Sequence, residues 1–99
     1  MFEIKKPTKK LNEICASLGH QYSIDVIDGE QVIYRKINDF YDIEVYGLNN
    51  NRKTFKATIF VWRLKPGKQT VEIIDGLKSF QSLKSALNRL VEKYQSLDQ

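Results

Sequence analysis

The chain has 99 residues, of which 41% are hydrophobic and 28% are charged, and its formal net charge is +4. This length suits one compact domain and is too short for two separate cores, so we expect residues 1–99 to form a single domain. No apolar run approaches the roughly 18 residues of a membrane-spanning helix. No apolar stretch follows the first basic residues, as it would in a secretory signal. The chain has a single cysteine, which excludes an intramolecular disulfide. Together these features predict a soluble, cytoplasmic protein without a membrane partner.

Charge is distributed unevenly along the chain. Residues 21–50 carry six acidic side chains against two basic ones, whereas residues 51–70 carry six basic side chains and no acidic one. A basic binding patch would produce this pattern, and so would acidic and basic strands that neutralise each other across a sheet. We favour the second interpretation because it requires no partner.

The first predicted element is a helix from about Thr8 to Leu18, which Gly19 would cap at its C-terminal end. Four apolar residues form one stripe along it: Leu11, Ile14, Cys15 and Leu18. Because Cys15 lies on this stripe, it is predicted to be a small buried hydrophobic residue and not a reactive thiol. The only histidine, His20, follows in a loop, and no catalytic partner for it is evident.

Residues 21–74 change from helical spacing to alternation, and turn sequences such as Asp28-Gly29 and Pro66-Gly67 divide them. This pattern predicts an antiparallel meander of about five strands, near Tyr22–Ile27, Gln31–Ile37, Phe40–Gly47, Thr54–Leu64 and Thr70–Ile74.

The register of the first hairpin stays open. A two-residue Asp28-Gly29 turn would align Ile24 with Ile33, whereas a three-residue loop that includes Glu30 would align Ile24 with Tyr34.

For the third and fourth strands, a shared apolar face requires facing residues whose numbers have an even sum. A sum of 100 sets Val45 opposite Phe55 and Glu44 opposite Lys56. The second pair predicts a cross-strand ion pair that accounts for part of the charge pattern.

A second helix is predicted from Ser79 or Ser82 to Leu97, with a sustained apolar stripe of Phe80, Leu83, Ala86, Leu87, Leu90, Tyr94 and Leu97. The predicted order is therefore α-β-β-β-β-β-α. This is an α+β fold in which an N-terminal and a C-terminal helix flank an antiparallel sheet and cover at least one of its faces.

The fourth strand has apolar residues on both of its faces. Phe55, Ala57, Ile59 and Val61 alternate with a second apolar set, and only one set is needed for a core. We therefore predict an interaction surface on the outer face, made of Tyr46, Lys56, Phe60, Trp62 and Leu64. Neighbouring basic residues could extend it: Arg52, Lys53, Lys65 and Lys68. Three explanations compete for this face, namely a helix packed over it, a contact with another protein or a second copy, and stacking of nucleic-acid bases.

Catalytic chemistry has little support in the sequence. The five glycines are isolated, so no phosphate-binding loop is present, and one histidine with one cysteine cannot supply a metal site by themselves. We expect no enzyme activity, no cofactor and no metal. The favoured interpretation is a small non-catalytic interaction module that acts through aromatic anchors. The alternative is an RNA- or DNA-binding module that uses the basic and aromatic residues of the fourth strand.

In outline, the layout resembles the double-stranded RNA-binding domain, in which a helix, three strands and a helix follow one another. The nearest match to that family's lysine-rich helix motif is Leu83-Lys84-Ser85-Ala86-Leu87, which keeps one lysine and the alanine. Apolar residues replace the other lysines and the number of strands differs, so the resemblance is one of layout and implies no membership.

Overall fold

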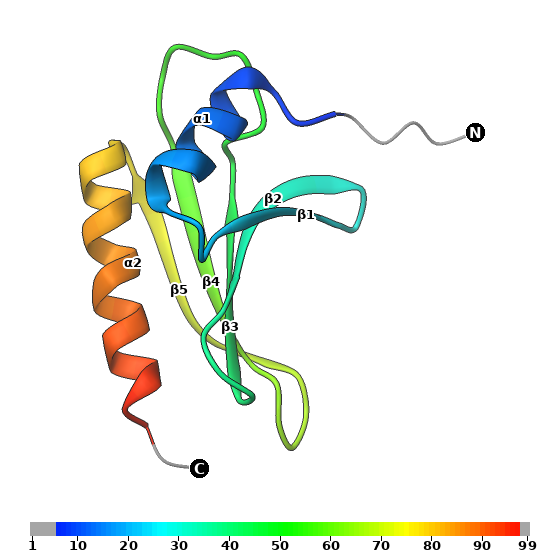
Figure 1. The fold of residues 1–99 in the computed structure, drawn as a ribbon, viewed down its shortest axis with the longest axis vertical. Helices are drawn as coiled ribbons and strands as arrows, with labels where there is room; N and C mark the ends of the chain where they lie inside the picture. Colours follow the sequence, from blue (N-terminus) through cyan, green and yellow to red (C-terminus); the bar gives the residue numbers. More distant parts are fainter. Residues whose placement is uncertain (1–5, 98–99) are drawn as a thin grey trace.

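The computed structural model describes residues 6–97, in which five antiparallel strands form one sheet between two helices (Figure 1). The elements are α1 (Lys9–Leu18), β1 (Ser23–Ile27), β2 (Glu30–Lys36), β3 (Tyr41–Tyr46), β4 (Ala57–Arg63), β5 (Gln69–Leu77) and α2 (Phe80–Gln95). The strands lie in the sheet in chain order, each beside the next. The predicted α+β class, the meander and the α-β-β-β-β-β-α order are therefore confirmed.

Polar caps define the helix ends. The Thr8 hydroxyl accepts a hydrogen bond from the Leu11 N–H at 3.1 Å, and Gly19 caps α1 at its other end. Ser79 caps α2. The prediction that α2 reaches Leu97 is wrong, because the helix ends at Gln95 and leaves Leu97 44% exposed beyond the core. Within residues 6–97, neither helix combines the length and the apolar character needed to cross a bilayer.

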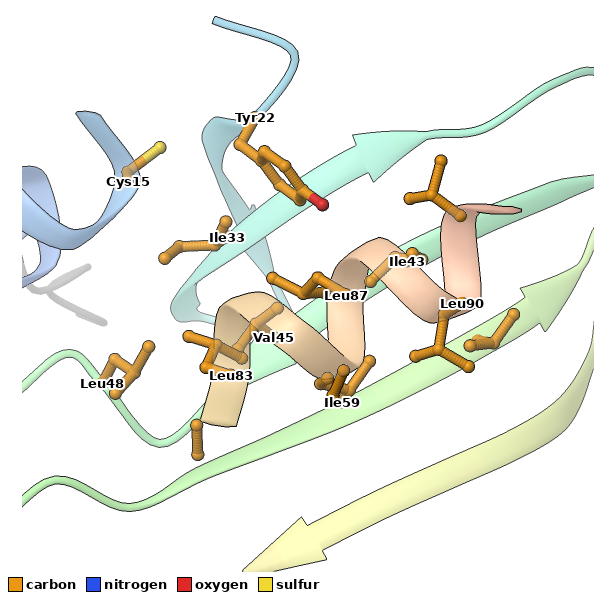
Figure 2. Close-up of a cluster of buried hydrophobic side chains, with 14 of the residues drawn as sticks. Cys15, Tyr22, Ile33, Ile43, Val45, Leu48, Ile59, Leu83, Leu87 and Leu90 are labelled. Carbon is orange, nitrogen blue, oxygen red and sulfur yellow. The ribbon is translucent and has the colours of Figure 1, made fainter. Parts of the chain in front are cut away.

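Both helices pack on the same face of the sheet. Leu11 and Cys15 of α1 join one hydrophobic cluster with the leucines of α2 and the inward residues of β2, β3 and β4. Figure 2 shows Leu83, Leu87 and Leu90 beside the strands of this cluster. Cys15 is buried as predicted, and burial raises the pKa of its thiol. In the described part of the chain, the opposite face of the sheet carries no helix.

The first hairpin uses the two-residue turn. Ile24 faces Ile33 and Ile27 faces Glu30, so Asp28 and Gly29 alone connect β1 to β2. Both have positive φ, 52° at Asp28 and 80° at Gly29. This is the type I′ geometry that follows the twist of the adjoining strands, and it decides between the two registers that the sequence left open.

The register between β3 and β4 differs from the prediction by four residues. Val45 faces Ile59 and Glu44 faces Phe60, so the predicted partners Phe55 and Lys56 do not stand opposite them. The predicted ion pair between Glu44 and Lys56 is therefore wrong. The prediction of which side chains share a face of the sheet is still correct. The sum of partner numbers remains even, and a shift by an even number of residues keeps every side chain on its face.

The connection between β3 and β4 causes this shift. Residues predicted to begin the fourth strand belong to a loop, and Lys10 of α1 holds that loop in place. Its ammonium group donates to Asn50 Oδ1 at 2.9 Å and to the carbonyl oxygens of Arg52 and Thr54 at 3.0 and 2.9 Å. These carbonyls are consequently engaged with a helix and not with a neighbouring strand, so β4 begins only at Ala57.

Gly47 makes the turn into this loop possible. Its φ is +94°, and a Cβ at this position would lie 2.7 Å from the Lys56 carbonyl oxygen. We therefore expect Gly47→Ala to lower the free energy of unfolding by about 2 kcal/mol or more, measured by urea denaturation, through left-handed strain and a backbone clash.

Two glycines provide matched controls for that variant. At Gly29, where φ is +80° with open space around it, alanine should cost only the left-handed strain. At Gly67, which also has open space, alanine should change stability by less than about 0.5 kcal/mol. Equal stability of all three variants would contradict the proposed clash at Gly47.

The fifth strand is longer than predicted. It runs from Gln69 to Leu77 and not from Thr70 to Ile74, and its pairing with β4 shifts at two irregularities. The irregularity between Ala57 and Ile59 allows pairing to continue past Gly76, whose φ is +71°, to the end of the strand. The added length brings Asp75 onto the helix-free face.

Candidate binding surface on the helix-free face

Alternation along β4 places its second apolar set on the face without helices. Val61 is fully buried in the core, and the next residue, Trp62, points to the other side of the sheet. Phe60 pairs with Ile73 of β5, and Thr58 pairs with Tyr46 of β3. Neither helix covers these side chains, so the explanation that a helix buries Phe60 and Trp62 does not apply.

This face is concave. A hollow of about 610 Å³ lies on it, and both edges of the sheet contribute to its lining. The lining residues are Ile27, Asp28, Glu30, Tyr46, Thr58, Phe60, Trp62, Ile73 and Asp75. Strands β1 and β5 are opposite edges of a five-stranded sheet, so the sheet must curl to bring them around one space. Figure 1 shows the β1–β2 hairpin turned strongly away from the direction of β3, β4 and β5.

Three aromatic rings form the wall of the hollow. Tyr46 and Phe60 meet edge to face, with ring centroids 5.2 Å apart. Lys68, in the β4–β5 turn, places its ammonium nitrogen 4.9 Å from the centre of the Trp62 ring. All three rings are only half-buried, and Ile73 beside them is 56% exposed. The hollow therefore presents aromatic and aliphatic surface to solvent.

Two carboxylates lie beneath this face. Asp42 is 5% exposed and Glu44 is 2% exposed, and a tyrosine hydroxyl donates to each. The distances are 2.9 Å from Tyr34 Oη to Asp42 Oδ2 and 2.9 Å from Tyr46 Oη to Glu44 Oε1. Burial raises the pKa of Asp42, and burial together with the neighbouring acids raises the pKa of Tyr34 to about 12. Tyrosine hydroxyl groups are thus the partners of these carboxylates, and not the ammonium group of Lys56 that the sequence predicts.

The rim of the hollow is also acidic. Asp28, Glu30 and Asp75 line it, and among the described residues no lysine or arginine does. Asp75 accepts a hydrogen bond from the Thr58 hydroxyl at 2.7 Å, which is the main reason why its pKa is lowered. The carboxylate of Asp75 is therefore held in its charged form at the mouth of the hollow.

The predicted interaction surface is brought together only in part. Tyr46, Phe60 and Trp62 line the hollow, whereas Lys56 lies in a neighbouring depression with Thr54 and Asn50. Leu64 is half-buried just beyond β4, where its N–H donates to the Phe40 carbonyl, and it does not line the hollow.

The predicted basic patch is divided between the two ends of β4. Arg52 and Lys53 lie in the β3–β4 loop, where they border a shallow depression against α1. Lys65 and Lys68 lie in the β4–β5 turn, beyond the other end of a seven-residue strand that is about 20 Å long. The four side chains do not form one basic surface.

The sequence pattern does not predict the acidic lining of Asp28, Glu30 and Asp75 or the contribution of β5. It places Asp42, Glu44 and Tyr46 on one face of a strand, but it indicates Glu44 as the partner of Lys56 and not as part of an acidic surface. For Ile73 and Asp75 no local signal existed, because their place in the hollow depends on the curl of the sheet.

Two polar atoms on this face remain unpaired within residues 6–97. Asp42 Oδ1 and Trp62 Nε1 are buried and have no hydrogen-bond partner there, although the two residues face each other across β3 and β4. An unpaired acceptor on a buried carboxylate is costly, which agrees with the raised pKa of Asp42.

Replacing Asp42 with asparagine should reveal that cost. The folded-state pKa of Asp42 lies above the ordinary value of about 3.9, so the folded protein binds the proton more tightly than the unfolded chain does. The contribution of Asp42 to the free energy of unfolding is therefore fully present below the ordinary pKa, and it is lost as the pH rises through the folded-state pKa. We expect Asp42→Asn to be more stable than wild type at neutral pH, by on the order of 1 kcal/mol, and the difference to shrink as the pH falls.

Urea denaturation of both proteins between acidic and neutral pH tests this prediction. Glu72→Gln serves as a control of opposite sign. Hydrogen bonds from Lys93 and Tyr94 lower the pKa of Glu72, so its contribution to stability is present above the ordinary pKa and is lost in acid. A stability difference between wild type and Asp42→Asn that does not depend on pH would contradict the assignment.

Comparisons of the chain with protein-family models, with curated proteins and with solved structures find no match.

Proposed function

We propose that the protein is a non-catalytic interaction module that binds a protein partner in the hollow on the helix-free face of its sheet. The observation that supports this most strongly is the accessible hollow of about 610 Å³, bordered by Tyr46, Phe60 and Trp62 and left uncovered by both helices. Aromatic residues in partly desolvated depressions are the usual anchors of protein interfaces. Ile73, at 56% exposure, extends the apolar surface to the edge of the sheet.

The absence of catalysis is part of the same proposal. His20 is exposed in the turn between α1 and β1 and does not line the hollow. The two buried carboxylates are engaged by tyrosine hydroxyls.

We also propose a reducing compartment such as the cytoplasm, because the only cysteine, Cys15, is a free thiol within the core.

Selection from a displayed library of random peptides tests the proposed site without knowledge of the partner. Wild-type protein should enrich peptides that lose at least about tenfold in affinity toward Ile73→Gln, since a neutral polar amide then replaces an apolar contact in the lining. Because Ile73 is largely exposed, this variant should fold normally.

Val26→Gln is the matched control for that selection. Val26 is 41% exposed and does not line the hollow, so the same change of an aliphatic residue to glutamine should leave affinity unchanged. If no enriched peptide discriminates Ile73→Gln from Val26→Gln, the hollow is not the binding site.

A second copy of the chain is one form that the partner can take. Light scattering would then give a dimer for wild type and a monomer for Trp62→Glu, because a buried glutamate at the contact is unfavourable. A wild type that is monomeric at every concentration would restrict the proposal to another protein.

Binding of RNA or DNA through Lys56, Phe60 and Trp62 stays a prediction, and the structure offers it less support. Phosphate groups would approach a hollow whose charged lining residues, among those described, are all acidic. Of the basic patch predicted beside these residues, Arg52 and Lys53 are separated from Trp62 by the length of β4, whereas Lys65 and Lys68 follow that strand and Lys68 contacts the Trp62 ring.

A further inference from the structure

We propose that the partner segment bound in the hollow inserts a basic side chain, arginine or lysine, against the aromatic wall and the acidic rim. This inference rests on the proposed function and specifies the chemistry of the ligand at the same site.

The charge of the face provides the first argument. Three lining carboxylates, those of Asp28, Glu30 and Asp75, surround the mouth of the hollow. Glu44 and Asp42 lie beneath the same face, one against Tyr46 and one opposite Trp62. A groove lined by one sign of charge raises the local concentration of the opposite sign and accelerates its capture. Charge complementarity therefore favours a cationic group over a neutral or an anionic one.

The cations near the hollow lie at its borders. Lys56 is close enough to Asp75 to contribute to the lowered pKa of that carboxyl, but it lies in the adjoining depression. Lys36 forms an ion pair with Asp39 at 3.4 Å in the β2–β3 turn. Among the described residues that line the hollow none is basic, but the ammonium group of Lys68 reaches Trp62 from the β4–β5 turn.

The aromatic wall provides the second argument. The faces of tryptophan, tyrosine and phenylalanine rings attract cations, and the attraction grows when the site is partly desolvated. Lys68 already places an ammonium nitrogen 4.9 Å from the centre of the Trp62 ring. This contact shows that the electrostatic environment of Trp62 accommodates a cation. Lys68 would therefore compete with a basic side chain of the partner for the ring.

The shape of the site suits a long basic side chain. A hollow of about 610 Å³ exceeds the volume of one side chain, and Ile27 and Ile73 lie among its walls. The aliphatic stem of arginine or lysine can pack on such residues while its charged end reaches the carboxylates. A planar guanidinium can in addition stack on a ring and bond a carboxylate with two N–H groups, so arginine should bind more tightly than lysine.

The test uses the peptides selected in the preceding experiment, titrated into wild-type protein at low and at high salt. We expect an arginine or lysine in each peptide that depends on Ile73. Replacing this residue with norleucine, which keeps the stem and removes the charge, should weaken binding at least about tenfold. Affinity should also fall as salt is raised.

Two protein variants with opposite expected effects complete the test. The triple variant Asp28→Asn, Glu30→Gln and Asp75→Asn should lose at least about tenfold for the basic peptide and nothing for its norleucine analogue. All three residues are exposed, and asparagine before Gly29 keeps a sequence favoured in this turn. Lys68→Gln should bind the basic peptide as tightly as wild type does or more tightly, because it removes a competing cation from Trp62.

The outcomes are separable. Peptides that depend on Ile73 but carry no basic residue, or a triple variant that binds as well as wild type, would overturn this inference and leave the proposed function standing. If the selection yields no peptide whose binding depends on Ile73, both this inference and the proposed function are overturned. Labelled RNA and DNA oligonucleotides provide the remaining arm. If they bind at this face and Lys68→Gln weakens them, the site recognises phosphate and the inference is wrong.

Discussion

Leu87→Ala should lower the free energy of unfolding by about 3 kcal/mol, among the largest effects expected for a single substitution in this chain. Leu87 is 1% exposed on the face of α2 that packs against the sheet (Figure 2). Truncation removes three carbons from a closely packed region that both helices share, and the surrounding residues can fill the resulting cavity only in part. Urea or thermal denaturation monitored by far-UV circular dichroism measures the loss.

Leu97→Ala is the matched control. The apolar periodicity predicts the same stripe for both leucines, yet Leu97 lies beyond the end of α2 and is 44% exposed. Its truncation should change stability by less than about 0.5 kcal/mol. If the two variants were equally destabilised, the helix would continue to Leu97 and the described end of α2 would be incorrect.

Tyr46→Phe should lower the free energy of unfolding by about 2 kcal/mol, a large effect for the removal of one oxygen atom. The hydroxyl of Tyr46 donates at 2.9 Å to Glu44, which is 2% exposed on the same strand. Without that donor, a buried charged carboxylate loses the tyrosine hydrogen bond. The ring itself is preserved, so its edge-to-face contact with Phe60 should remain.

A double-mutant cycle with Glu44→Gln isolates this interaction. In the Glu44→Gln background the side chain is neutral, and leaving it without the tyrosine donor costs less than leaving a carboxylate. Tyr46→Phe should therefore be at least about 1 kcal/mol less destabilising there. Equal penalties in the two backgrounds would mean that the hydroxyl does not stabilise the Glu44 charge.

The elements of the fold could be predicted to a large extent, because each depends on neighbouring residues. Thr8 and Ser79 are polar caps immediately before apolar stripes, and Asp28-Gly29 is a turn sequence whose backbone preference is intrinsic. Alternation of side chains along a strand is a property of the extended backbone, so the opposite directions of Val61 and Trp62 required no knowledge of the tertiary structure.

The registers and the composition of the binding surface were harder to predict, because long-range contacts decide them. Lys10 engages a loop 40 to 44 residues away and delays the start of β4, which places Glu44 opposite Phe60. No local pattern reports such a contact. The same is true of Asp75, which reaches the mouth of the hollow through the bulged pairing of β5 with β4.

By itself the sequence determined an α+β fold with two amphipathic helices and a fourth strand that is apolar on both faces, since these follow from the periodicity of side chains along each element. Only the tertiary structure decided that both helices cover the same face, that the reverse face is hollow and that its lining is acidic. Curvature joins the two edge strands around one space, and the lengths of loops and turns leave the lysines out of its lining, although Lys68 reaches Trp62 from the β4–β5 turn. The sign of the charge carried by the lining residues is thus a consequence of how the strands pair and curl, and it cannot be obtained by counting residues along the chain.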